Sequence, residues 1–263
     1  REERGTRISF TLKDEYKEFA EEYRVKSIIQ KYSNFIGFPI FIGKERINSL
    51  EALWRKSKDE LKDDELTEFY KYVAGDFKAP LGHLHLSLEG TVNFKALLFV
   101  PPDAPYDIFN DIREKSLHLY TNRVFVQDNA PDLLPEYLRF IKGVVDTEDL
   151  PLNISRQVTQ DSPVMAKIRN VLTTRILGML EDWAKKDSAK YEKFYKNFGH
   201  VLKLGVNSDF VNKDKIIKLL RFESTTKNKG DLTSLDDYIT RMPEKQKEIY
   251  YLTGENREII EKN

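Results

Sequence analysis

Apolar residues near the start of the chain recur with two different periods. Residues 5 to 12 alternate apolar and polar positions, which predicts a half-buried strand. The charged residues 13 to 22 then predict a short helix or a linker. From 22 to 35 the apolar residues recur every three or four positions, so we expect an amphipathic helix, followed by a strand at 38 to 42. This end of the chain is expected to be a helix that leads into a sheet.

The middle of the chain is rich in strand patterns. After a short helix that Asp64 can cap, residues 92 to 100 alternate strictly, and Pro101-Pro102 ends this run. Residues 117 to 126 and 140 to 145 predict further strands. Together these elements predict a mixed sheet with helices packed on it.

The C-terminal part is mainly helical in pattern. Ser162 and Pro163 are a typical helix start, Asp187 can cap the next helix, and a third apolar helical face covers 216 to 222. We expect these helices to form a spacer between two sheets.

A smaller α/β pattern closes the chain. Thr233-Ser234 can cap a helix that Pro243 ends. The run at 249 to 252, Ile-Tyr-Tyr-Leu, then predicts a strand, and another helix follows it.

These patterns predict an α/β (α+β) fold in which a larger α/β unit and a smaller α/β unit are joined by a helical connector. The expected boundaries are 1 to 22 for a terminal strand and linker, 23 to 161 for the larger unit, 162 to 225 for the connector and 226 to 263 for the smaller unit. The chain begins without methionine and ends in a polar tail after an unfinished helical pattern, so we expect a segment of a longer protein.

Composition narrows the class of partner. Lys and Arg balance Asp and Glu at 43 each, so no net field attracts nucleic acid or anionic lipid. The chain has no cysteine, which excludes disulfides and cysteine nucleophiles, and no apolar run approaches the roughly 20 residues of a membrane span. We expect a cytoplasmic protein whose partners are proteins or small molecules, with no nucleic acid and no membrane.

The sequence lacks the common motifs of nucleotide and metal sites. Its 12 glycines never form G-x-G-x-x-G or G-x-x-x-x-G-K. His83 and His85 would share one face of a strand, but two ligands lack a third, and a structural role is favoured. Helix capping explains the acidic pairs Asp63-Asp64 and Asp236-Asp237. No metal site is expected.

The most informative segment runs from 137 to 160. It predicts a buried strand, then a loop, and then the helix start at Ser162. A loop mounted in this way is held rigidly, and Arg156 on it offers a planar fork of five donors that suits phosphate oxygens. On spacing alone, a structural role for such an arginine is the commoner one.

The run GVVDTEDLPLNISR at 143 to 156 resembles a signature in the middle segment of the ninety-kilodalton heat-shock family of molecular chaperones. The resemblance extends over nearly the whole chain, through KYSNFIGFP, ALW, EFY, LFVP, APYD, KLLRFES and IYYLTG. Residues 5 to 12 resemble the last strand of the family's nucleotide domain, and 13 to 22 resemble the short bacterial form of the linker after it.

This resemblance implies a fold and an activity. The implied fold is a larger three-layer α-β-α unit, like the ribosomal protein S5-like second domain of the GHKL ATPases, and a smaller α-β-α unit, with a catalytic loop at 147 to 161. A separate N-terminal domain binds ATP and Mg²⁺, and Arg156 of the middle segment reaches the γ-phosphate. Gln160 matches a glutamine of the same loop. Gln157 stands where many members have glutamate, so the resemblance does not determine the resting position of this loop.

The resemblance also implies partners. These are the N-terminal nucleotide domain, a C-terminal dimerisation domain that makes the parent a homodimer, and non-native client proteins. Trp54 matches a tryptophan implicated in client contact, although a tryptophan in an amphipathic segment is as often a core residue. For Phe125, which the family places near the domain interface, core packing is favoured.

Two other functions stay open. One is a stand-alone α/β protein-binding scaffold module without a role in ATP hydrolysis. The other is an independent phosphotransfer enzyme of the wider superfamily, such as the transducer domains of topoisomerases, which use a lysine where this chain has Arg156. The arginine and the long match favour the chaperone. The isolated segment is not expected to be an enzyme by itself.

Overall fold

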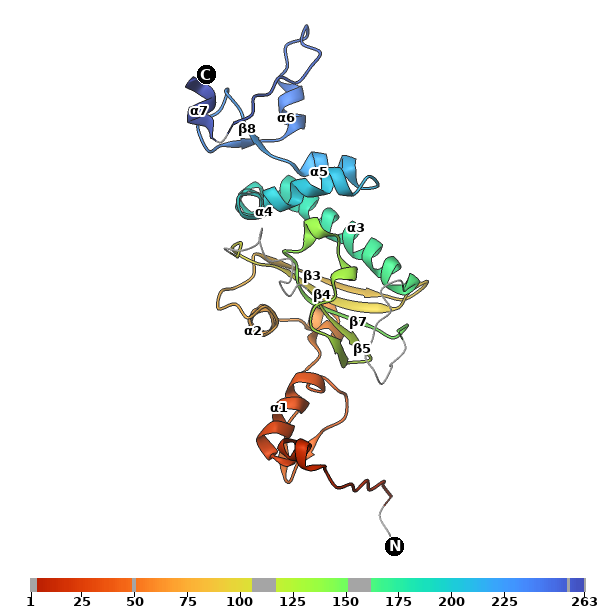
Figure 1. The fold of residues 1–263 in the computed structure, drawn as a ribbon. Coiled ribbons are helices and arrows are strands. Elements are labelled where there is room, and N and C mark those ends of the chain that lie inside the picture. Colours follow the sequence, from red (N-terminus) through yellow and green to blue (C-terminus); the bar gives the residue numbers. More distant parts are fainter. Residues whose placement is uncertain (1–3, 49–50, 106–116, 151–161, 255, 263) are drawn as a thin grey trace.

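The computed structural model describes residues 4–48, 51–105, 117–150, 162–254 and 256–262. A five-stranded sheet lies near the middle of an elongated molecule, with α1 at one end and a small C-terminal unit at the other (Figure 1). Up to the end of the sheet, with η for a 3-10 helix, the elements are η1 Asp14–Ala20, α1 Glu22–Tyr32, β1 Phe41–Ile42, β2 Glu45–Arg46, η2 Leu53–Arg55, η3 Lys58–Glu60, α2 Asp63–Ala74, β3 Gly82–Leu88, β4 Phe94–Val100, β5 Leu117–Thr121, β6 Val124–Gln127, η4 Pro131–Leu133, η5 Glu136–Leu138 and β7 Lys142–Thr147. The later elements are α3 Pro163–Lys186, α4 Ser188–Ser208, α5 Lys213–Leu219, β8 Phe222–Glu223, β9 Leu232–Thr233, α6 Leu235–Thr240 and α7 Arg257–Lys262.

The central sheet is mixed, as the strand patterns predict. Its order is β3-β4-β7-β5-β6, and β7 pairs antiparallel with β4 and parallel with β5. The single strand predicted over 117 to 126 is instead a hairpin, because Asn122 and Arg123 adopt φ values of 50° and 65° and turn the chain. Gly143 in β7 has φ of 140°, and an added Cβ there would lie 2.2 Å from the carbonyl oxygen of Leu97. Only glycine fits this position without displacing β4.

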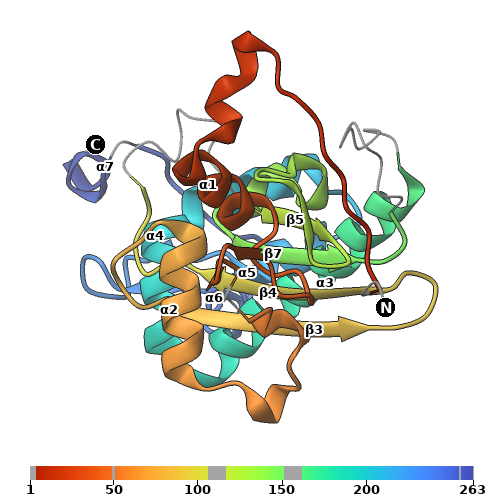
Figure 2. The ribbon, with the colours of Figure 1, turned by 90° about the horizontal axis from the view of Figure 1, so that it is seen from below.

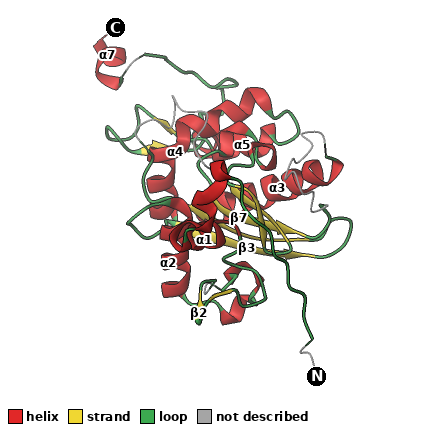
Figure 3. Ribbon diagram, turned by 60° about the horizontal axis from the view of Figure 1, so that its bottom comes forward, coloured by secondary structure: helices red, strands yellow, loops and turns green. Residues whose placement is uncertain are grey.

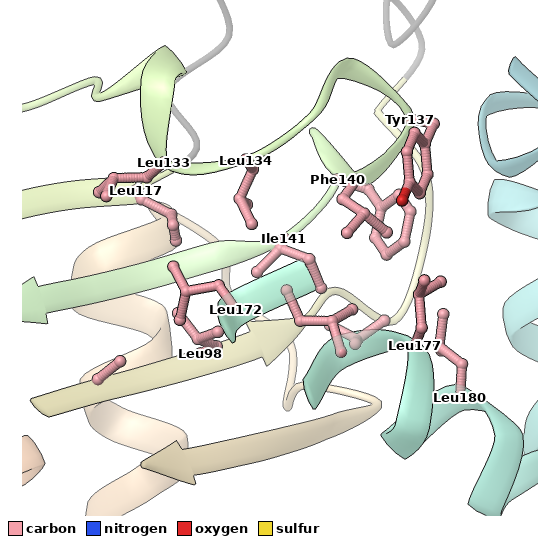
Figure 4. Close-up of a cluster of buried hydrophobic side chains, with 14 of the residues drawn as sticks. Leu98, Leu117, Leu133, Leu134, Tyr137, Phe140, Ile141, Leu172, Leu177 and Leu180 are labelled. Carbon is pink, nitrogen blue, oxygen red and sulfur yellow. The ribbon is translucent and has the colours of Figure 1, made fainter. Parts of the chain in front are cut away.

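Helices cover both faces of this sheet (Figures 1 and 2). On one face, Leu98 and Leu117 of the sheet belong to the same buried cluster as Leu172, Leu177 and Leu180 of α3, and Leu172 lies close to Leu98 (Figure 4). On the other face, an aromatic cluster joins the sheet to η2 and α2; its buried members are Phe35, Leu53, Trp54, Leu66, Phe69, Tyr70, Leu97, Phe99, Tyr120, Phe125 and Val144. Because both faces are covered, all six residues of β7 are buried.

The helices predicted as a connector also form one layer of the core. Residues of α3 and α4 belong to the same buried cluster as one face of the sheet. The small sheet of β8 and β9 follows α5 and lies with α6 and α7 (Figure 1). The domain boundaries, and the named fold that the resemblance implies, stay predictions.

Four helix caps are predicted, at Asp64, Ser162, Asp187 and Ser234, and two of them are confirmed. Ser162 precedes α3, which begins at Pro163 as predicted, but its side chain makes no capping hydrogen bond. The Asp187 carboxylate accepts a hydrogen bond from the backbone N of Lys190 at 3.0 Å, and the Ser234 hydroxyl accepts one from the backbone N of Asp237, also at 3.0 Å. The cap predicted at Asp64 is wrong, because α2 already begins at Asp63. In the first turn the Asp64 carboxylate complements the helix dipole instead. None of the helices in the described residues is both long and apolar enough to span a membrane.

Three strand predictions are wrong or too long. Residues 5 to 12 are not in a strand within the described part of this chain, and they lead away from the sheet as an exposed segment with Ile8 80% and Phe10 79% exposed (Figure 3). Residues 249 to 252 are also irregular and largely exposed. The strand predicted at 38 to 42 is reduced to Phe41–Ile42. An alternating pattern does not form a strand unless a partner backbone lies beside it.

Candidate functional site

The described part of the candidate site is the end of β7 and the residues that follow it as far as Leu150. The predicted site residues Arg156 and Gln160 lie outside the described residues, as does Gln157. The structure therefore shows how the chain is held where it enters the predicted catalytic loop.

Asp146 connects three distant parts of the chain at this point. Its side chain is 0% exposed. The carboxylate accepts hydrogen bonds from the indole Nε1 of Trp54 at 2.9 Å, from Nε of Arg55 at 3.1 Å and from the backbone N of Arg123 at 3.2 Å. A buried carboxylate is costly unless it is paired and hydrogen-bonded, and these three donors meet that need. Asp146 thereby ties η2 and the β5–β6 turn to the end of β7.

Arg55 holds a second carboxylate beyond the strand. A terminal guanidinium nitrogen of Arg55 lies 2.9 Å from Oε1 of Glu148, while its Nε contacts Asp146. One planar fork therefore bridges two carboxylates that are separated by a single residue.

Asn93 holds the alternate residues of the same segment. The Thr147 hydroxyl donates to the carbonyl oxygen of Asn93 at 2.7 Å, and the Asp149 carboxylate accepts from the backbone N of Asn93 at 2.6 Å and from its Nδ2 at 3.1 Å. The backbone N of Asp149 also donates to the Thr147 hydroxyl at 3.2 Å. Where the chain leaves β7, Arg55 therefore binds residues 146 and 148, and Asn93 binds residues 147 and 149.

Trp54 is a core residue in this structure. Its side chain is fully buried, with ring centroids 4.8 Å from Phe35 and 5.1 Å from Tyr120. Phe125 is also buried, 5.4 Å from Tyr120, which confirms core packing for that residue. The indole of Trp54 offers no surface to a client in this conformation, so its expected client contact stays a prediction that would require the ring to leave its pocket.

One of the two histidines predicted to lie on a strand contacts the backbone of η2. Nε2 of His85 lies 3.1 Å from the carbonyl oxygen of Trp54 and steadies η2 on β3. No group of three His, Asp or Glu side chains in that part of the chain is placed to hold a metal ion.

Comparison with known proteins identifies the family. The family model described as Hsp90 protein matches residues 41–263. The chain belongs to the Hsp90 family. It is 55% identical over 260 residues to the chaperone protein HtpG of Chlorobium phaeovibrioides, covering 98% of this chain and 42% of that protein. For HtpG of Escherichia coli O1:K1 / APEC the identity is 45% over 269 residues, covering 97% of this chain and 43% of that protein.

This Hsp90 chain therefore spans less than half the length of the curated relatives it matches. The chain is also 42% identical over 288 residues to HtpG of Geobacter sulfurreducens. This match covers 100% of this chain and 44% of that protein. The resemblance seen in the sequence is confirmed at the level of the family.

Sequence reasoning on this Hsp90 chain missed Arg55 and Asn93. Arg55 lies 91 residues from Asp146, and Asn93 lies 56 residues from Asp149. The only local signal came from the hydrogen-bond acceptors. The acidic residues 146, 148 and 149 lie at the end of a buried strand, where they require donors from elsewhere in the chain.

The burial of Trp54 predicts its fluorescence in the folded Hsp90 chain. Trp183 is the other tryptophan, so the Trp183→Phe variant isolates the signal of Trp54. We expect blue-shifted emission and weak quenching by acrylamide, because the ring is enclosed by aromatic neighbours and its N–H is bonded to Asp146. Measuring the quenching constant with and without an unfolded client checks this. A strongly quenched Trp54 that a client then protects would show an exposed ring and support direct client contact.

Proposed function

We propose that this chain is the middle segment of an ATP-dependent molecular chaperone. In the parent, the N-terminal domain holds ATP and Mg²⁺, and this segment docks on it and supplies Arg156 to the γ-phosphate, with Gln160 in the same loop. The C-terminal domain of the parent makes it a homodimer. The segment also contributes to the binding of non-native client proteins.

Membership of the Hsp90 family and the chaperone names of the relatives support this proposal. The observation that carries the catalytic part is the anchored exit of β7, since Arg156 follows it in sequence. Arg55 and Asn93 fix four consecutive residues of this exit through the contacts described above. Phosphoryl transfer gains most from a cation that is positioned in advance where charge develops, so a firmly anchored approach suits such an arginine.

The structural alternative is that Arg156 binds a local carboxylate such as Glu148 or Asp149. Both carboxylates already have partners, Arg55 for Glu148 and Asn93 for Asp149. These contacts reduce the need for a further cation at this place. A carboxylate can accept additional hydrogen bonds, and replacing Arg156 distinguishes a structural role from a catalytic one.

ATP and Mg²⁺ are assigned to the N-terminal domain. Among the described residues there is no cluster of three potential metal ligands, and the whole sequence lacks the phosphate-binding glycine motifs. Mg²⁺ bound with the nucleotide would neutralise charge between the phosphates, and this chain would add the loop residues Arg156 and Gln160 and the contacts that support the loop.

The proposal predicts complementation between separate domains. We expect the isolated chain to neither bind nor hydrolyse ATP appreciably, and a mixture with a matching Hsp90 nucleotide domain to turn over ATP faster than that domain alone. The reason is that the arginine stabilises charge that develops on the γ-phosphate during transfer. Steady-state phosphate release at increasing concentrations of this chain measures the effect.

The matched control for this mixture is the chain with Arg156→Ala, which should dock equally well and give no increase. If the wild-type chain binds the nucleotide domain without raising turnover, a scaffold role without ATP chemistry is the better description. Calorimetry that detects micromolar ATP affinity for the isolated chain would also contradict the assignment of the nucleotide to the other domain.

A further inference from the structure

One side chain at the β7 exit combines a buried contact with an accessible one. The side chain of Arg55 is 21% exposed. Of its two partners, the Asp146 side chain is 0% exposed and the Glu148 side chain is 58% exposed. The inner half of this bridge belongs to the core, and the outer half lies at the surface where solvent and salt reach it.

We propose that Arg55 is a positioning residue for ATP hydrolysis, acting through its bridge from Asp146 to Glu148. The bridge fixes residues 146 and 148 where the chain leaves β7, and Arg156 follows this exit in the sequence. This inference rests on the proposed function. It adds Arg55 to the residues that act in ATP hydrolysis. Arg55 lies outside the signature at 143 to 156, 91 residues before Asp146 in the sequence.

The geometry of the fork explains why an arginine suits this position. Nε of Arg55 faces the carboxylate of Asp146, and its terminal nitrogen faces that of Glu148, at 3.1 Å and 2.9 Å. A guanidinium presents these donors at a fixed angle, so the two carboxylates are held at a fixed separation. A lysine at position 55 presents a single ammonium and cannot reproduce this arrangement.

The energetics separate positioning from folding. An ion pair with one partner more than half exposed contributes little to stability, so loss of the Glu148 contact should leave the fold intact. A small displacement of a catalytic group, in contrast, strongly reduces the rate. The same exposure makes the contact sensitive to salt, since mobile ions screen accessible charges.

The test uses the full-length parent and three matched substitutions. Glu148→Gln removes the outer charge and keeps the shape, and Arg55→Lys keeps the charge and removes the fork. The control is Asp182→Asn, because Asp182 is 62% exposed and pairs with Lys186 at 2.9 Å on α3, away from this exit. We expect both exit variants to lower kcat for ATP about three- to tenfold with KM nearly unchanged, and the control to match wild type.

Two further measurements show whether the role is one of positioning. The melting temperature of Glu148→Gln should equal that of the control, and Glu148→Asp, which restores the charge, should recover part of the lost kcat. The Arg156→Ala variant serves as the reference for the proposed function in the same assay.

The possible outcomes separate the two claims. If Arg156→Ala lowers turnover while Glu148→Gln and Arg55→Lys retain wild-type kcat, the positioning role is wrong and the proposed function stands. A fall in melting temperature with unchanged kcat would also overturn it, since the bridge would then be purely structural. If Arg156→Ala itself leaves turnover unchanged, both the proposed function and this inference fail.

Discussion

Replacing Arg156 by alanine in the full-length parent is expected to lower ATP turnover at least about tenfold, with nucleotide affinity and thermal stability nearly unchanged. A contact that forms mainly in the closed, hydrolysis-ready state lowers the barrier without tightening binding in the ground state. The loss should therefore appear in kcat and not in the dissociation constant of ATP. Turnover, nucleotide affinity and melting temperature should be measured on the same preparation.

The Arg156→Lys variant sharpens this test. An ammonium keeps the charge but loses the planar fork, so we expect lysine to restore little of the turnover. The opposite pattern, in which Arg156→Ala lowers the melting temperature and the folded fraction retains normal turnover, would mean that Arg156 holds a local carboxylate. That result would remove the catalytic assignment.

Replacing Asp146 by alanine is expected to lower the free energy of unfolding of the chain by about 3 kcal/mol. The buried N–H of Trp54 and the Nε of Arg55 would both lose their acceptor, and a buried donor without a partner carries the full cost of its desolvation. Urea denaturation followed by circular dichroism measures the change.

Glu148→Ala is the matched control for Asp146→Ala. It removes the other carboxylate of the same Arg55 fork, but from an exposed position, so its cost should stay below about 1 kcal/mol. Equal destabilisation by the two variants would show that burial of Asp146 does not determine its contribution. Asp146→Asn should fall between them, because the amide keeps an acceptor oxygen and loses the charge.

Local chemistry made part of the fold predictable from the sequence. The caps at Asp187 and Ser234 depend on residues only three positions away, and both were predicted correctly. The strict alternation at 92 to 100 also predicted β4, although the structure buries both of its faces because helices lie on each side of the sheet.

Features that depend on distant partners were not predictable. The segments 5 to 12 and 249 to 252 have strand patterns, yet neither pairs with a strand in the described part of the chain. Trp54 has an ambiguous pattern, and its burial is decided by Asp146, which lies 92 residues later. For the candidate site, sequence reasoning identified Arg156 through a resemblance, whereas the contacts of Arg55 and Asn93 that support the exit of β7 became visible only in three dimensions.

The order of strands in the central sheet has a consequence for how this chain folds during its synthesis. The hairpins β3–β4 and β5–β6 each pair neighbours in the sequence, but β7, which lies between β4 and β5, leaves the ribosome after both hairpins. Until β7 inserts, β4 and β5 each present an open edge to other chains. While it is being made, a protein of a chaperone family is thus expected to expose two strand edges that can pair with other chains.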